Sequence, residues 1–373
     1  MTRRRFWLSV AAIWAITSVL LIIITWSAIV AWRFPDPDDQ MRLLQVRDWL
    51  AGQSWFDLTQ HRLNDPVGVP MHWSRVVDLP IAAVIVTLRP LLGQLAAEHV
   101  ALVVVPLLTL GVVMALVAAL ARRLLANDGA ALMAVCITPL GVEVLHQLRP
   151  MRIDHHGWQM ATALLAAYAL VGAPTRKAGL LAGATIAVWL SISLEGLPMI
   201  AAILGLVSLK WAVMPANRPL LTATVAAISV GAVFIFLVSH PASAWLVSPC
   251  DAVSPVYLAM LMVATVGTIA LTALPIRTVA GRLAGLAGVG VAALVPLPLL
   301  APQCAAGPFG QLDPLVHHYW YMNVAEGLPL WDQTPFAIVN TIALPLLGLA
   351  GALVLVRASL LAQLRRRWAR SAF

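Results

Sequence analysis

The sequence predicts an all-α protein that crosses a membrane many times. Of its 373 residues, 61% are hydrophobic and only 11% are charged, whereas a soluble domain carries roughly 25% charged residues. Apolar runs also recur along the chain at the length of a membrane-spanning helix, which is about 20 residues. A soluble core is unable to cover this much apolar surface, so lipid must cover part of it.

The apolar runs predict about ten spans. The first, 6–32, is too long for the apolar part of a signal peptide, which has roughly 7–15 residues. The segment 79–93 is also apolar, but its short length and the pair Arg89-Pro90 favour a helix lying at the membrane surface. The other spans are expected near 99–121, 129–146, 157–173, 178–194, 197–214, 219–239, 257–275, 283–301 and 336–356.

The basic residues indicate how the spans are oriented. They occur in the connections at 122–123, 176–177, 218 and 277–282, and in the tail 365–370. Because cytoplasmic connections are enriched in Lys and Arg, we expect a cytoplasmic N-terminus in a bacterial inner membrane. Two long loops, 33–98 and 302–335, then lie on the periplasmic side. We expect one membrane domain, 1–373, with no soluble C-terminal domain.

The net charge of +8 does not predict nucleic-acid binding, because the arginines flank apolar segments and form no basic face. Membrane lipids are the expected partners instead. Of the three cysteines, Cys136 falls inside an apolar segment. Cys250 and Cys304 fall in connections predicted to be periplasmic, where disulfides form. A bridge between them and two separate buried thiols both remain open.

The first long loop opens with a group of acids, Asp36, Asp38 and Asp39, around Pro37. A proline at the first position and acids in the first turn predict a helix that runs to Gly52. One interpretation is an amphipathic helix resting on the membrane with a solvated acidic start. The other is a binding site, because hard divalent cations prefer carboxylate oxygens.

A second polar group lies in a short turn between two predicted spans, at 149–157. Asp154 and His156 are two residues apart, so both can face one metal ion; solvation by lipid head groups is the alternative. Arg149 and Arg152 are able to hold a phosphate by charge-assisted hydrogen bonds, or to anchor at head groups. Two further acids are candidates, Glu195 at the end of a span and Glu326 in the last long loop.

These segments together resemble the membrane domain of oligosaccharyltransferase catalytic subunits, especially the archaeal ones, within the GT-C class of glycosyltransferases. Asp36-Pro37 with Arg42 is similar to the acidic motif of the first external loop. Asp154-His155-His156 is similar to the second acidic motif, which reads Asp-x-His in archaeal members. The segments 65–73 and 78–82 resemble the Pro-x-Gly stretch and the flat helix after it, and Val324-Ala325-Glu326 the short motif of the fifth external loop.

The resemblance implies Mg²⁺ or Mn²⁺ held by Asp36, Asp154 and His156. The ion would neutralise the phosphate leaving group of a polyprenyl-linked sugar. It also implies that Glu326 binds the acceptor or completes the metal site. Arg42, Arg149 and Arg152 are expected to contact the pyrophosphate because of their charge, not because of the resemblance.

The family's soluble C-terminal domain, with its Trp-Trp-Asp-Tyr-Gly motif, is absent, which indicates a shortened relative or a fragment. Asparagine glycosylation therefore does not follow. The expected function is transfer of a sugar or glycan from a polyprenyl phosphate or diphosphate donor to an unknown acceptor at the periplasmic face. One alternative is a transporter or flippase of lipid-linked envelope precursors, which Pro106 and Pro139 inside predicted spans favour. Another is an inactive scaffold.

Overall fold

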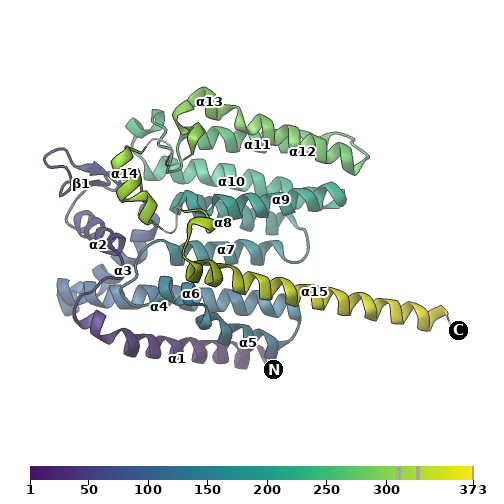
Figure 1. Cartoon of the computed structure of the whole chain (residues 1–373), viewed down its shortest axis with the longest axis horizontal. Helices are drawn as coiled ribbons and strands as arrows, with labels where there is room; N and C mark the ends of the chain where they lie inside the picture. The colour runs from purple at the N-terminus through teal and green to yellow at the C-terminus, as the bar shows by residue number, and fades with distance from the viewer. Residues whose placement is uncertain (308, 310–311, 325–327, 372–373) are drawn as a thin grey trace. The chain divides into compact units, whose positions relative to one another are not determined.

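The computed structural model describes residues 1–307, 309, 312–324 and 328–371, and the side chains among them except 355 and 358–371. It is built of helices and one short two-stranded ribbon (Figure 1). Its contacts divide the chain into two compact units, Met1–Leu140 with Val144–Gln311 and Gly141–Glu143 with Leu312–Phe373. Each unit is described by itself.

The α-helices up to residue 311 are α1 (Arg3–Val30), α2 (Pro37–Leu50), α3 (Arg75–Leu92), α4 (Gln94–Leu125), α5 (Asp128–Ile137), α6 (Val142–Leu148), α7 (His156–Leu170), α8 (Arg176–Ile192), α9 (Leu197–Val213), α10 (Arg218–Ser239), α11 (Pro255–Ala273), α12 (Val279–Leu294) and α13 (Pro296–Leu300). Short 3₁₀ turns cover Thr138–Leu140, Leu194–Gly196, Pro215–Asn217, Ala242–Leu246 and Pro302–Ala306. The ribbon pairs β1 (Thr59–Gln60) with β2 (Val69–Pro70) in antiparallel register, Thr59 opposite Pro70.

The second unit contains α14 (Pro314–Tyr319) and α15 (Pro335–Ser371), with 3₁₀ turns at Tyr321–Asn323 and Leu330–Asp332. Asp313 caps α14, because its carboxylate accepts a 2.8 Å hydrogen bond from the backbone N–H of Leu315. An acceptor of this kind satisfies one of the free N–H groups at a helix start. The first part of α15, Pro335–Val354, is apolar and long enough to span a membrane.

Each of the ten predicted spans falls on a helix or on a bent pair of helices. Within the described residues, seven helices are long and apolar enough to cross a membrane, and α5 with α6 makes an eighth if this pair, bent by 72°, is one span. α7 and α8 have 15 and 17 residues, fewer than the roughly 20 that a span needs. The all-α architecture with several helices able to span a membrane is confirmed, while the number of spans and their direction stay predictions.

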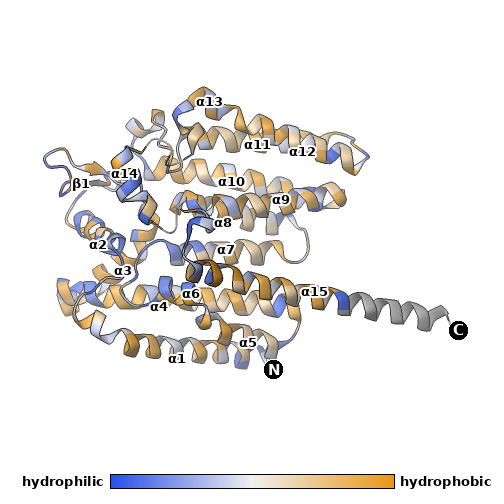
Figure 2. Ribbon diagram, in the orientation of Figure 1, coloured by the Kyte–Doolittle hydropathy of each residue, from blue (hydrophilic) through white to orange (hydrophobic). Residues whose placement is uncertain are grey.

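Hydrophobic residues predominate along several long helices (Figure 2). Ile24 on α1 is 75% exposed, and Val230 and Phe234 on α10 are 68% and 64% exposed. Exposed apolar surface on this scale is typical of a face that lipid or a partner covers. The hydropathy of the helices therefore agrees with a location in the membrane.

α8 and α10 pack with their backbones in close contact. A Cβ atom on Gly179 would lie 2.5 Å from the carbonyl oxygen of Leu220, and one on Gly183 would overlap the carbonyl oxygen of Thr224. Small residues four positions apart allow helices in a membrane to approach this closely. The spacing of these two glycines therefore sets the distance between the two helices.

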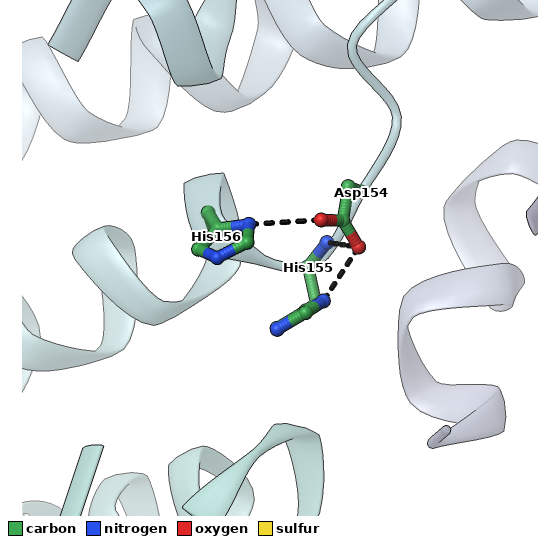
Figure 3. A group of neighbouring side chains, drawn as sticks. All are labelled: Asp154, His155 and His156. Atoms are coloured by element: carbon green, nitrogen blue, oxygen red, sulfur yellow. Dashed lines mark hydrogen bonds and ion pairs between the residues drawn. The ribbon is translucent and has the colours of Figure 1, made fainter. Parts of the chain in front are cut away.

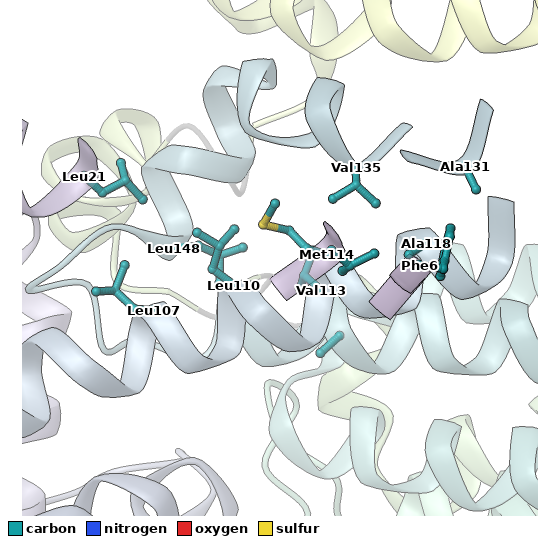
Figure 4. Packing of buried hydrophobic residues seen from close by; sticks show 12 residues of the cluster. Phe6, Leu21, Leu107, Leu110, Val113, Met114, Ala118, Ala131, Val135 and Leu148 are labelled. Atoms are coloured by element: carbon teal, nitrogen blue, oxygen red, sulfur yellow. The ribbon is translucent and has the colours of Figure 1, made fainter. Parts of the chain in front are cut away.

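A hydrophobic cluster joins α1, α4, α5 and α6 (Figure 4). Phe6, Leu110 and Met114 are fully buried within it, and Leu148 at the end of α6 is 1% exposed. The first turn of α7 approaches the same place closely, because a Cβ on Gly157 would lie 2.7 Å from Leu148. The turn between α6 and α7 is thus held at both ends by packing.

The first long loop folds as α2, the ribbon and α3. The helix predicted from Pro37 to Gly52 is confirmed as α2, with Asp36 as its N-cap. The helix predicted at 79–93 is α3, which begins earlier, at Arg75, and buries Ile81 and Ile85. The sequence did not predict the ribbon. The indole N–H of Trp55, just before the ribbon, donates a 2.7 Å hydrogen bond to the carbonyl of Val238 on α10.

Cys250 and Cys304, 54 residues apart, form a disulfide. The structure therefore decides between the two alternatives that the sequence left open. Cys304 is buried beside Val256 and Ala301, so the bond joins the segment before α11 to the segment after α13. Cys136 on α5 is free and exposed.

Replacing Gly183 by valine should destabilise the protein, because the new side chain would overlap the backbone of α10. We expect a loss of roughly 1–3 kcal/mol, the usual cost of overpacking. Thermal unfolding of the detergent-purified protein measures it. Gly205→Val is the matched control, since a Cβ on Gly205 meets no atom within 4 Å. Equal melting temperatures for the two variants would contradict the close contact.

Alkylation of the denatured protein counts its free thiols. Without a reductant we expect one labelled cysteine, Cys136, and after reduction all three. Mass spectrometry of the labelled protein distinguishes the two states, with Cys136→Ser as the control that removes the first label. Three labelled thiols before reduction would show that the disulfide does not form.

Candidate functional site

The candidate site begins where α2 meets the turn between α6 and α7. Asp39 in the first turn of α2 is fully buried. Its carboxylate accepts hydrogen bonds from the backbone N–H groups of Ile153 (2.8 Å) and Asp154 (3.0 Å). The turn is also tied to α4, because the N–H of Met151 donates to the carbonyl of Leu102 at 2.8 Å. Two segments more than a hundred residues apart are thus fixed against each other.

Arg152 links the acids of α2 to Asp154. Its guanidinium nitrogen Nη1 lies 3.2 Å from an oxygen of Asp36 and 3.2 Å from an oxygen of Asp39, and Nη2 lies 3.7 Å from Asp154. Nε donates to the side-chain oxygen of Gln147 at 2.8 Å. The Arg152 side chain is only 2% exposed, and a buried charge of this kind requires such partners.

Two histidines join Asp154 to Glu195 (Figure 3 shows the Asp154 side). Nδ1 of His155 lies 2.5 Å from one oxygen of Asp154, and Nδ1 of His156 lies 2.8 Å from the other. Their Nε2 atoms lie 3.2 Å and 3.6 Å from the same oxygen of Glu195. The two imidazoles stack with their centres 4.3 Å apart. Each imidazole therefore bridges the same two carboxylates.

Glu195 and Gln159 form the more open side of this arrangement. The Glu195 side chain is 45% exposed, whereas that of Asp154 is 1% exposed. The amide of Gln159 donates to Glu195 at 2.8 Å, and the indole N–H of Trp189 donates to the oxygen of Gln159 at 3.0 Å. Trp189 thereby fixes the orientation of the amide, and the amide holds the carboxylate.

Burial and charge shift the pKa values of the site in opposite directions. Burial raises the pKa of Asp39 to about 7, although the positive charge of Arg152 lowers it. Burial would raise the pKa of Asp154 too, but hydrogen bonds from His155 and His156 hold it well below its usual range. Burial would lower the pKa of His155, yet hydrogen bonds to Asp154 and Glu195 raise it to about 9. His155 is therefore a cation at neutral pH, and Asp154 an anion.

A further layer of polar side chains supports Asp154 from α2 and α3. Arg42 lies 3.0 Å from Asp78 and 3.7 Å from Asp154, and its guanidinium stacks 4.6 Å over the ring of Trp73. Gln45 donates to Asp78 at 2.7 Å. Both Arg42 and Asp78 are buried, and Asp78 also lies 3.3 Å from the guanidinium of Arg75, so it is a counter-charge shared by two buried arginines.

The structure brings most of the predicted site residues into one network: Asp36, Arg42, Arg152, Asp154 and His156. Arg149 makes none of these contacts. Glu326 lies outside the described residues. Arg42 and Arg152, predicted as phosphate contacts, pair with carboxylates, so their phosphate role stays a prediction.

The predicted metal ligands Asp154 and His156 occur together with His155. These three residues offer ligand atoms that all lie within 4.8 Å of one another. Asp36, the third predicted ligand, contacts Arg152 rather than the histidines. The set that the structure brings together therefore differs from the predicted set by one residue, and metal binding itself stays a prediction.

Asp78, Gln45 and Gln159 were not found from the sequence. Each lies on a helix, where polar residues are common without any function. Asp39 was noted as one of three acids, but its bonds to the N–H groups of Ile153 and Asp154 depend on tertiary contact. Only Gln159 carries a signal that could have identified it, because it is a polar residue at the start of the apolar run of α7.

No family model, no curated protein and no solved structure matches this chain.

Asp39→Ala should destabilise the protein strongly, because it leaves two buried N–H groups without an acceptor and removes one of the carboxylates that pair with the buried Arg152. We expect a loss of about 3–5 kcal/mol, the range for breaking a buried ion pair. Asp48→Ala on the same helix is the control: Asp48 pairs with Arg62, whose side chain is 55% exposed, and such pairs contribute about 0–1 kcal/mol. Thermal unfolding in detergent compares them, and similar losses would contradict the anchoring role of Asp39.

Proposed function

We propose that this chain is a membrane glycosyltransferase of the GT-C type. It transfers a sugar or glycan from a polyprenyl phosphate or diphosphate donor to an acceptor at the periplasmic face of a bacterial inner membrane. The basic connections on the opposite side support this orientation. The four sequence motifs that resemble oligosaccharyltransferase catalytic subunits support the reaction class.

The observation that carries the proposal is the meeting of Asp36 and Asp154 on the guanidinium of Arg152. These two acids belong to the two motifs that the resemblance singles out, and they are 118 residues apart along the chain. They come from the start of a loop helix and from a turn between apolar helices. A donor whose lipid remains in the membrane would present its phosphate and sugar at such a position.

Exposure distinguishes the roles of the carboxylates. The side chain of Asp36 is 37% exposed, whereas those of Asp39 and Asp154 are buried and fully engaged. Asp36 is therefore the carboxylate of this group that is open to a substrate. We assign it as the general base: it accepts the proton of the acceptor as the acceptor oxygen or nitrogen bonds to the anomeric carbon. The bond from that carbon to the phosphate oxygen breaks in the same step.

The other residues position the turn and Asp36 and stabilise charge that develops during the reaction. Asp39 and Arg152 hold the turn in place, and Arg152 orients Asp36. The cationic His155 places positive charge beside Glu195, on the more open side. Charge fixed in advance by such contacts stabilises charge that develops in a transition state. The departing phosphate is the group that would gain from it.

The residues present fit a divalent metal. Asp154 and His156 offer one oxygen and one nitrogen ligand, with the carboxylate of Glu195 beside them, a mixed set that suits Mn²⁺ better than the oxygen-preferring Mg²⁺. Asp154 and His156 would hold the ion, with Glu195 adjacent. When bound, it would supply positive charge to the leaving phosphate.

Asp36→Asn tests the proposed base. Asparagine caps a helix as well as aspartate, so α2 should keep its start while the carboxylate is lost. We expect release of polyprenyl phosphate from polyprenyl-linked sugars to fall by roughly 10²–10⁴-fold, the usual contribution of a general base. The assay uses purified protein in detergent with pooled donors and Mn²⁺ or Mg²⁺, and the melting temperature shows whether the variant is folded.

Asp48→Asn on the same helix is the matched control and should keep full turnover. Turnover that is unchanged in Asp36→Asn would contradict the assignment of the base. If no donor releases polyprenyl phosphate but a labelled lipid-linked sugar crosses the bilayer of proteoliposomes, the chain is a flippase instead.

A further inference from the structure

A small cavity lies between the end of α1 and the turn that follows α6. Its volume is about 180 Å³, and its lining includes Thr25, Ser27, Arg33, Phe34, Pro35 and Arg149. This volume is below the roughly 300–1,000 Å³ of pockets that enclose a whole drug-sized ligand. It suits a single head group rather than a complete lipid or sugar chain.

The two arginines of this cavity have no counter-charge among the described residues. No carboxylate lines the cavity, and neither guanidinium has an ion pair or a side-chain hydrogen bond there. Nε of Arg149 is buried without a hydrogen-bond partner. The other arginines close to the site behave differently, because each pairs with an acid: Arg42, Arg47, Arg75 and Arg152.

We propose that Arg33 and Arg149 bind the phosphate group of a membrane lipid. Two guanidinium groups without an acid match a phosphate, because each presents several N–H donors in a planar fork. The hydroxyl of Ser27 is a further donor at the rim, whereas Thr25 gives its proton to the carbonyl of Leu21. A buried Nε without an acceptor is costly, and a phosphate oxygen would remove that cost.

The position of the cavity favours a lipid over a free phosphate. Its α1 wall ends an apolar helix on which Leu20, Ile23 and Ile24 are all more than half exposed, and these residues share a helix face with Ser27 because they precede it by seven, four and three positions. These side chains form a surface along which an acyl or polyprenyl chain can lie while its head group enters the cavity. A free anion would gain nothing from them.

The cavity also adjoins the proposed site along the chain. Phe34 and Pro35 lead directly into Asp36, and Arg149 precedes Arg152, which pairs with Asp36. The binding of a lipid phosphate does not depend on the proposed transferase function. Its identification as the phosphate of the sugar donor rests on the proposed function.

Equilibrium binding of a radiolabelled polyprenyl monophosphate to the detergent-purified full chain tests the proposal. This ligand carries no sugar, so it reports binding whether or not the chain is a transferase. We expect Arg33→Gln and Arg149→Gln each to weaken binding by about tenfold, as the loss of a charged hydrogen bond predicts. Arg149→Lys should retain part of the affinity, since it keeps the charge.

Arg89→Gln is the matched control: Arg89 is an exposed arginine at the end of α3 that does not line the cavity. It should bind as the unaltered protein does. An equal loss in Arg89→Gln would show attraction to general positive charge and overturn the site. Equal binding of the uncharged polyprenol would show that only the chain is held. Inorganic phosphate that binds as tightly as the polyprenyl phosphate would overturn the assignment to a lipid.

Discussion

The buried guanidinium of Arg152 is the contact on which the polar site depends. It lies against Asp36 and Asp39 at the start of α2 and against Asp154 in its own turn. A positive charge removed from water needs such partners, and removing any of them would leave a large desolvation cost. The pairing therefore does more than stabilise: it fixes where α2 lies relative to the turn that carries Asp154 and the histidines.

This polar contact is possible because apolar packing holds both sides of it. Leu148 and Gly157 fix the turn against α4, and Ile81 and Ile85 fix α3 against the same helix. Within this frame the buried acids are held at short distances from one another, which burial and like charge oppose. The pKa of Asp39 is raised because burial disfavours its charged form. The pKa of Asp154 is lowered because hydrogen bonds from the two histidines stabilise its charged form despite burial.

Two sets of arginines around the site differ in their partners, and the difference bears on function. Arg42, Arg75 and Arg152 are buried and neutralised by carboxylates, so they maintain the fold and orient acids. Arg33 and Arg149 line a cavity and have no acid near them among the described residues. A cation of the second kind has its hydrogen-bonding capacity available for an anion from outside the chain.

The amino-acid sequence by itself determined the class of the protein and the places where chemistry is concentrated. Apolar runs of span length predict helices, because lipid leaves the backbone no other way to satisfy its polar groups, and local rules place the start of α2 at Pro37. The acids and histidines were visible as rare polar residues in an apolar chain.

Tertiary structure alone decided which of them meet: the pairing of Asp36 with Arg152, the anchoring by Asp39, and the bridge from Asp154 to Glu195. It also decided that Cys250 bonds to Cys304 and that Arg149 lines a cavity to which Arg152 does not contribute. Those outcomes depend on how helices pack across long stretches of chain, and local patterns carry no information about such contacts.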